Sequence, residues 1–176
     1  MAVRPPFFPP KEKLVATREE IEAKFWKALK SDMTAMLGLV GVEEGHAQPM
    51  TAQIGDREGR GPIWFFSAKE VDLVKAIGAG KPAMLHFASK GHDLFASVEG
   101  RLVLDNDRST IDRLWSPFAA AWYEEGKDDP KLQLIRFEPD AAQVWLNENS
   151  LFAGIRMLLG SDPKQDYKDK VAEIAM

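Results

Sequence analysis

The fold is decided by the stretch His46-Ala-Gln-Pro-Met-Thr-Ala-Gln-Ile-Gly-Asp-Arg-Glu-Gly-Arg-Gly-Pro-Ile-Trp-Phe-Phe-Ser67. Two runs typical of β-strands flank a connector that holds three glycines and mixed charge, a pattern that predicts a β-hairpin. The strands of such a hairpin bring together Met50, Thr51, Phe66 and Ser67. These four side chains would form a floor on which a ligand can lie.

The composition is that of a soluble globular protein. The chain has 176 residues, of which 45% are hydrophobic and 28% are charged, enough for one domain with a sizeable core. No apolar run approaches the roughly 20 residues that span a bilayer. A net charge of −4 argues against broad nucleic-acid binding, and the lack of cysteine excludes disulfides and thiolate chemistry. The proline-rich segment 1–10 lacks the apolar core of a signal peptide, so we expect a cytoplasmic protein without nucleic-acid or membrane partners.

The N-terminal half combines one clear helix with several extended segments. Thr17 and Glu20 fit a capping box, and Ile21, Phe25 and Leu29 recur every four residues as one apolar stripe. The expected segments are an N-terminal arm at 1–16, a helix at about 18–31, an apolar run at 33–42, a turn at 43–45, strands at 46–54 and 62–67, a helix at about 71–77, and a strand at 82–89.

The C-terminal half contains a second hairpin, which turns at 90–93. Gly100 marks a bend or bulge in its second strand, and Asp107 can cap the following helix. The expected segments are a strand at 94–105, a helix at 108–123, a loop at 126–130, a strand at 132–137, an interruption at Pro139, a short strand at 143–146, a helix at 151–160, and a surface tail or short helix at 161–176. The core domain is thus predicted to span residues 17–160.

The order of elements favours a mainly β (α+β) fold. Six or seven strands with hairpin connections do not show the regular alternation of strand and helix that a parallel sheet requires. An antiparallel barrel with accessory helices fits this order better. Because a small barrel fills its interior with side chains, a large cofactor would bind on its outside or at a subunit boundary.

Several familiar catalytic and metal motifs are missing. The histidines at 46, 86 and 92 have no metal-ligand spacing, so we expect no metal site. A phosphate-loop reading of Gly78–Pro82 fails, because Lys75 replaces the first glycine and Pro82 replaces the serine or threonine. No serine-hydrolase elbow is present either. We assign no catalytic acid or base.

Aromatic residues are the strongest remaining signal. The chain has five tryptophans and ten phenylalanines, whose ordinary role is core packing but which can also pack against a planar ligand. Trp115 and Trp145 remain open to either interpretation. Lys69 and Lys75 follow the strand that carries Ser67, where one could reach an anion; otherwise they are solvent-facing lysines.

Seven short motifs, in a fixed order and spacing, together point to one family. They are Gln48-Pro-Met-Thr51, Ile63-Trp-Phe-Phe-Ser67, Ser97-Val-Glu-Gly-Arg-Leu102, Leu114-Trp-Ser-Pro117, Asp129-Pro130, Arg136-Phe-Glu-Pro139 and Val144-Trp145. Over about residues 17–147 the chain resembles the general stress protein 26 group of the pyridoxamine 5′-phosphate oxidase-like, flavin-binding split-barrel superfamily.

This resemblance implies a six-stranded antiparallel split barrel that forms a homodimer with two FMN molecules, or FAD in some relatives, at the interface. Carried over by position, it places Phe66 and Ser67 on the strand beside the flavin. Trp145 would approach the flavin from the other subunit, and Trp115 is a second candidate for that role. The residues implied beside the isoalloxazine ring and ribityl chain are Gln48, Pro49, Met50 and Thr51.

The sequence also departs from the oxidases of this superfamily. Their Ser-Arg-Lys phosphate clamp is replaced by Val71-Asp-Leu73, so that phosphate would rely on Lys69, Lys75 or other donors. Their Arg-x-His pair is replaced by Leu151 and Ala153. Pyridoxamine 5′-phosphate oxidation is therefore not expected.

Two hypotheses follow for function. The first is a flavin-binding protein of the general stress type, which can act as a weak oxidoreductase because the flavin itself carries the redox chemistry. The alternative is a protein that binds or senses flavin, or another flat ligand, without turnover. A barrel that stacks nucleobases is disfavoured by the acidic charge balance. The sequence leaves open whether the protein is an enzyme and which electron donor, acceptor or substrate it would use.

Overall fold

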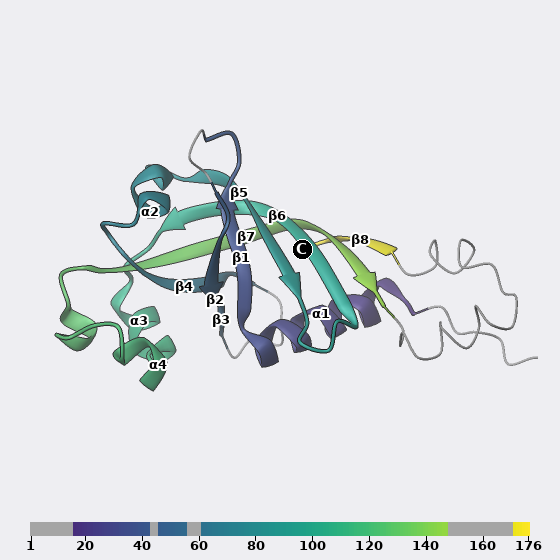
Figure 1. The fold of residues 1–176 in the computed structure, drawn as a ribbon, viewed down its shortest axis with the longest axis horizontal. Coiled ribbons are helices and arrows are strands. Elements are labelled where there is room, and N and C mark those ends of the chain that lie inside the picture. Colours follow the sequence, from purple (N-terminus) through teal and green to yellow (C-terminus); the bar gives the residue numbers. More distant parts are fainter. Residues whose placement is uncertain (1–15, 43–45, 56–60, 148–170) are drawn as a thin grey trace, which may run out of the picture.

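An eight-stranded antiparallel sheet, curled into a nearly closed barrel, forms the body of the molecule (Figure 1). The computed structural model describes residues 16–42, 46–55, 61–147 and 171–176. Its strands are β1 (Thr34–Leu39), β2 (Gln48–Thr51), β3 (Gln53–Ile54), β4 (Ile63–Ala68), β5 (Lys81–Ala88), β6 (Leu94–Leu104), β7 (Leu132–Leu146) and β8 (Val171–Ala175). Their order is β2-β1-β5-β6-β7-β4-β3, and β8 pairs with β7. The expected mainly β split barrel is confirmed.

The helices are α1 (Arg18–Asp32), α2 (Asp72–Ile77), α3 (Arg108–Leu114) and α4 (Pro117–Ala120), with a 3₁₀ turn η1 at Gly126–Asp128. The predicted capping box of α1 is confirmed, since Thr17 and Glu20 each bond the other's backbone amide at 2.9 and 3.2 Å. The apolar stripe of α1 is buried in the same core as the inner faces of β1, β5, β6 and β7. In the described part of the chain, no helix has the length and apolar character to span a bilayer.

The strand pairing within 46–67 differs from the predicted hairpin. β2 pairs with β1, and only β3 pairs with β4. The change of partner falls at Ala52, which is 1% exposed and whose amide donates to the carbonyl of Met33 at 2.6 Å. Ala52 thus forms a corner at which the chain passes from one end of the sheet to the other and closes the barrel. The residues of the connector at 56–60 lie outside the described residues.

β7 is one continuous strand, so the interruption predicted at Pro139 is wrong. Pro139 pairs with Gly100 at the register shift in β6, which confirms the predicted bulge. On its other side, β7 pairs with β4 up to Phe137 and with β8 from Ala141. Pro139 falls in the gap between these two partners and beside the register shift, and a bulge is a position at which a sheet tolerates proline.

The single helix predicted at 108–123 is also wrong, because α3 and α4 are separate. Asp107 caps α3 as expected, accepting from the Thr110 amide at 2.8 Å. Ser116 has an extended backbone, with φ −133° and ψ 163°. This is the conformation that a following proline imposes, so Pro117 ends one helical segment and begins the next. η1 occupies part of the predicted loop.

The C-terminal residues 171–175 form β8, where a surface tail or short helix was predicted. Ala172 and Ile174 are buried, and both belong to the main core. The alternation of apolar and polar residues at 171–175 is short, and it was not recognised as a strand because it follows the highly charged segment 161–170. The N-terminal arm, the turn at 43–45, the predicted helix at 151–160 and residues 161–170 lie outside the described residues.

Candidate functional site

The outer face of the sheet forms a continuous surface across six strands. One cross-strand row passes from Pro49 through Met36, His86, Ser97 and Gln143 to Glu173. All of these side chains except Ser97 are exposed in the described part of the chain, whereas their neighbours in sequence on β1, β5, β6 and β7 are mostly buried. The period-2 alternation of side chains along each strand thus leaves this face exposed to solvent.

Trp145 lies on this outer face, near one end of β7. Its cross-strand neighbour Phe95 is 39% exposed, and Trp145 itself is half-buried. The ring of Phe95 stacks on His92, with 6.4 Å between ring centroids and 5° between planes. The row of aromatic rings is therefore open to a flat ligand or to another protein surface.

Phe66 and Trp115 meet at the other end of the barrel, within the same chain, whereas the family resemblance implied Trp115 as a neighbour of the flavin from the second subunit. Their ring centroids are 5.6 Å apart and their planes are nearly perpendicular. Both side chains are half-buried. They belong to a second apolar cluster, which packs between β4, β7, the helix α3 and Tyr123.

Tyr123 completes this aromatic cluster and was missed by the sequence analysis. Its ring lies 6.4 Å from that of Phe66 and 5.9 Å from that of Trp115. Its hydroxyl donates to the backbone carbonyl of Ser67 at 2.7 Å. Burial, with a smaller contribution from Asp129, raises the pKa of Tyr123 to about 12. The available signal was its position shortly after the Leu-Trp-Ser-Pro motif.

The four residues of β2 lie at the edge of the sheet, next to β4. β2 and β4 are in contact, and Gln53, two residues after the end of β2, pairs with Trp64 of β4. Pro49 and Thr51 are exposed. The side-chain nitrogen of Gln48 donates to the sulfur of Met50 at 3.4 Å, a weak bond that a ligand oxygen could replace.

The two predicted anion-binding lysines each hold a protein partner. Lys69 Nζ donates to the carbonyl of Pro130 at 2.6 Å. Lys75 Nζ lies 3.2 Å from Asp72 Oδ1, in a pair whose side chains are 60% and 84% exposed. An ion pair this exposed contributes little, so Lys75 can exchange it for an anion.

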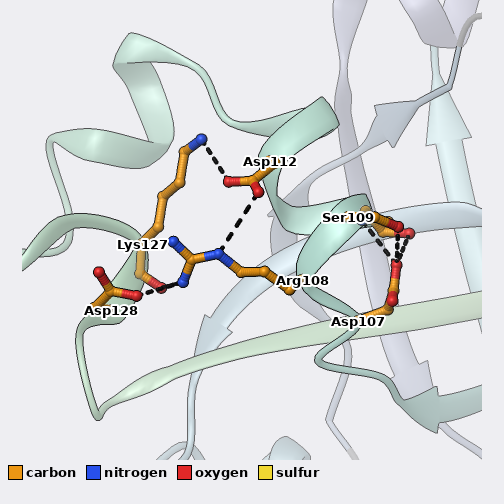
Figure 2. Close-up of polar contacts among 7 residues, drawn as sticks. Asp107, Arg108, Ser109, Asp112, Lys127 and Asp128 are labelled. Atoms are coloured by element: carbon orange, nitrogen blue, oxygen red, sulfur yellow. Dashed lines mark hydrogen bonds and ion pairs between the residues drawn. The ribbon is translucent and has the colours of Figure 1, made fainter.

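A network of charged side chains fastens α3 to η1 (Figure 2). Arg108 pairs with Asp112 at 3.6 Å and with Asp128, and Lys127 pairs with Asp112 at 2.6 Å. The hydrogen bond from Lys127 lowers the pKa of Asp112, and that to Asp128 raises the pKa of Arg108. The network joins two segments that flank Trp115 and Tyr123 in the chain.

Two shallow grooves lie on the outer face of the sheet, away from the predicted residues. One of about 700 Å³ surrounds the bulge between β5, β6 and β7. The other, of about 530 Å³, reaches β8, and the two share Met84 and Glu99. Neither groove is lined by any of the ten predicted flavin residues.

Within one chain, Trp145 and Phe66 lie far apart. Phe66 pairs with Leu134, and Trp145 stands eleven residues further along β7. At about 3.3 Å per residue, this separation is roughly 35 Å along the strand. Figure 1 shows β7 crossing the molecule from the side of α3 and α4 to the side of β8.

The fold defines the class of protein as an antiparallel split β-barrel with accessory helices. The chain belongs to the pyridoxamine 5′-phosphate oxidase-like family, whose model matches residues 20–167, and within it to the general stress protein 26 group. No curated protein matches the chain significantly.

Three solved structures illustrate the likeness. A Xanthomonas campestris pv. campestris protein assigned to the general stress family is 58% identical, with a TM-score of 0.72, over 77% of this chain and 92% of that one. The general stress FMN/FAD binding protein of Xanthomonas citri is 57% identical, with a TM-score of 0.71, over 75% and 92%. A Jannaschia sp. CCS1 protein assigned as general stress protein 26 is 27% identical, with a TM-score of 0.74, over 91% and 100%.

Proposed function

We propose that this protein binds flavin, with FMN as the cofactor and FAD as an alternative, at a site shared by two copies of the chain in the cytoplasm. The observation that carries this proposal is the 57% identity to the FMN/FAD binding protein of Xanthomonas citri. The shared site is supported by the separation of Phe66 and Trp145 along β7. A second copy is the simplest way to bring a tryptophan from the far end of β7 to Phe66.

The residues present fit the ring and ribityl chain of a flavin. Phe66 offers a half-buried aromatic surface, which Trp115 supports from behind at 5.6 Å. The partner copy would supply Trp145 as a second apolar wall. Thr51 and Gln48 carry the hydroxyl and amide groups that can bond the ring edge and the ribityl hydroxyls.

The fit is poorer at the phosphate. Lys69 and Lys75 are the candidate donors, and each would have to leave its present partner. Asp72 adds an unfavourable negative charge at the place where the oxidases carry their clamp. We therefore expect FMN to bind more weakly than it would with a full set of charge-assisted bonds.

Flavin, when bound, would supply redox chemistry, and the chain's residues would orient it and exclude water. None of the ten predicted residues is positioned as a general acid or base, so the proposal includes an oxidoreductase role only through the flavin. Pyridoxamine 5′-phosphate oxidation is not part of it.

The test is the absorption spectrum of the protein as isolated, followed by titration of FMN with fluorescence detection. We expect either bound flavin, identified by mass after release, or saturable quenching of added FMN. A protein without flavin absorbance that leaves FMN fluorescence unchanged would contradict the proposal.

The second candidate function is flavin binding or sensing without turnover. It is favoured by the absence of an acid or base among the predicted residues. Rapid-mixing experiments with NADH and NADPH separate the two functions. An oxidoreductase would show reduction of the bound flavin faster than free FMN is reduced, whereas a sensor would not.

A further inference from the structure

Tyr123, in the second cluster, contacts both predicted flavin residues of β4, Phe66 and Ser67. Its ring packs at 6.4 Å from Phe66, and its hydroxyl donates to the carbonyl of Ser67 at 2.7 Å. The side chain is only 8% exposed, so neither contact is shared with bulk water. The Tyr123 side chain thus holds both the ring of Phe66 and the backbone of β4 at Ser67, beside the proposed flavin.

Tyr123 is itself held in place by the segment around it. Its backbone carbonyl accepts from the Gly126 amide at 3.1 Å, at the start of η1. The charged network of Figure 2 fastens η1 to α3. Each exposed ion pair alone is weak, but several that share groups order a segment more effectively.

The strand end that Tyr123 contacts is tied to the same segment. The Lys69 amide donates to the Lys131 carbonyl at 2.9 Å, and Lys69 Nζ donates to the Pro130 carbonyl. Ser67 and Lys69 are therefore both hydrogen-bonded to the chain between Tyr123 and Lys131. A shift of Tyr123 would therefore move both the end of β4 and Lys69, the predicted phosphate donor that follows it.

We propose that Tyr123 is a positioning residue for the flavin site, which holds Phe66 and Ser67 in the geometry that flavin requires. This inference rests on the proposed function. The physical basis is preorganisation: a site that is already ordered loses less conformational entropy when it binds. Because burial raises the pKa of Tyr123 to about 12, the hydroxyl remains a donor across the physiological pH range.

The test compares Tyr123→Phe with Thr110→Val. Tyr123→Phe keeps the ring and removes only the hydroxyl that bonds Ser67. Thr110→Val is the matched control, because it removes a second buried hydroxyl from the same region, which bonds Asp107 at 2.8 Å instead of β4. FMN affinity is measured by fluorescence titration, and the exchange of the backbone amides of residues 67–69 is measured without flavin.

Tyr123→Phe should lower the affinity for FMN roughly five- to tenfold, which is the loss expected for one buried hydrogen bond. It should also increase the rate of backbone amide exchange at residues 67–69. Thr110→Val should change FMN affinity less than twofold. Equal FMN affinity in wild type and Tyr123→Phe would overturn the inference and leave the proposed function standing. Equal losses in both variants would also overturn it, because a general loss of stability would then be the cause. If wild type binds no FMN, the proposed function fails, and the inference fails with it.

Discussion

Asp72 and Lys75 form an exposed ion pair on the first turns of α2, and this pair would affect how the proposed site holds a phosphate. Their atoms are 3.2 Å apart, so the charge of Lys75 is already partly neutralised. Asp72 would also repel a phosphate that binds at the proposed site. A single carboxylate therefore weakens the anion-binding end of the site in two ways.

Asp72→Asn should raise FMN affinity about two- to fivefold, because it frees Lys75 and removes the repulsion. Riboflavin lacks the phosphate, so its affinity should not change. Fluorescence titrations of both ligands at low and moderate salt measure this difference. An equal gain for riboflavin would show that Asp72 does not act on the phosphate.

At the scale of elements, the start of α3 depends on the carboxylate of Asp107. Hydrogen bonds from Ser109 and Thr110 lower the pKa of Asp107 in the folded protein. A group whose folded pKa is lowered stabilises the fold above its unfolded pKa. That contribution is lost as the pH falls below about 3.9 toward the lower folded value.

Asp107→Ala should lower the melting temperature at pH 7, because the helix loses its cap and its charge near the positive helix end. The difference from wild type should shrink as the pH falls below about 4, where the wild-type carboxylate also becomes protonated. Melting curves between pH 7 and pH 3 check this. Asp72→Asn, in an exposed surface pair, is the control and should show little change at either pH.

The bulge places an extra residue, Asp140, in β7 opposite the Glu99–Gly100 step of β6, and it requires glycine at position 100. A Cβ atom there would lie 2.3 Å from the Glu138 carbonyl oxygen and 2.6 Å from the Phe137 ring. Gly100 thus lets β6 and β7 approach closely at the point where Pro139 passes. The long strand β7 depends on this local arrangement.

Gly100→Ala should lower the free energy of unfolding by about 1–3 kcal/mol, as overpacking of a tight site does. Gly91→Ala is the matched control, since its Cβ would meet nothing closer than Asp93 Oδ1 at 3.4 Å. Urea unfolding of both variants measures the difference. A Gly100→Ala protein as stable as Gly91→Ala would mean that the bulge can relax.

Local patterns were enough to predict the elements whose bonds are local. α1 and its capping box, α2, and the hairpin of β5 and β6 follow from residues close in sequence. The errors fall where a distant partner decides. Pro139 is tolerated because β4 and β8 leave a gap beside it, and Ala52 changes partner because the barrel closes there. Neither of these strand pairings can be predicted from the residues next to Pro139 or Ala52 in the sequence.

The residues of the candidate site also divide into those that the sequence motifs indicated and those that depend on a distant contact. The family motifs singled out both Phe66 and Trp115, but the contact between them within one chain was not predicted. Tyr123 was missed because its role depends on a hydrogen bond to Ser67, 56 positions away in sequence. A contact between two single side chains that are distant in sequence produces no periodic pattern of residues from which it could be predicted.

At the scale of the whole molecule, the proposed shared site depends on the outer face of the sheet. This face carries Met36 and Phe95, which are 41% and 39% exposed, and the half-buried Trp145. Large apolar side chains gathered on one uncovered face are typical of a protein interface. A homodimer formed through it would bury these residues.

Phe95→Lys should shift the protein toward monomer and reduce FMN binding at least tenfold, because it places a charge in the proposed interface. Sedimentation velocity and FMN titration are the measurements. Glu124→Lys, a charge change on an exposed turn outside this face, is the control. A dimeric Phe95→Lys protein with normal FMN binding would contradict the shared site.

β8 has a further consequence for how this molecule stays separate from other chains. It pairs with Ala141–Trp145 and so covers the backbone donors and acceptors along one border of β7. Without residues 171–176 that border would be open, and an open border of this kind recruits strands from other molecules. Residues 171–175 therefore occupy a border of β7 that another strand could otherwise pair with, beside the tryptophan on which an ordered pairing of two copies would depend.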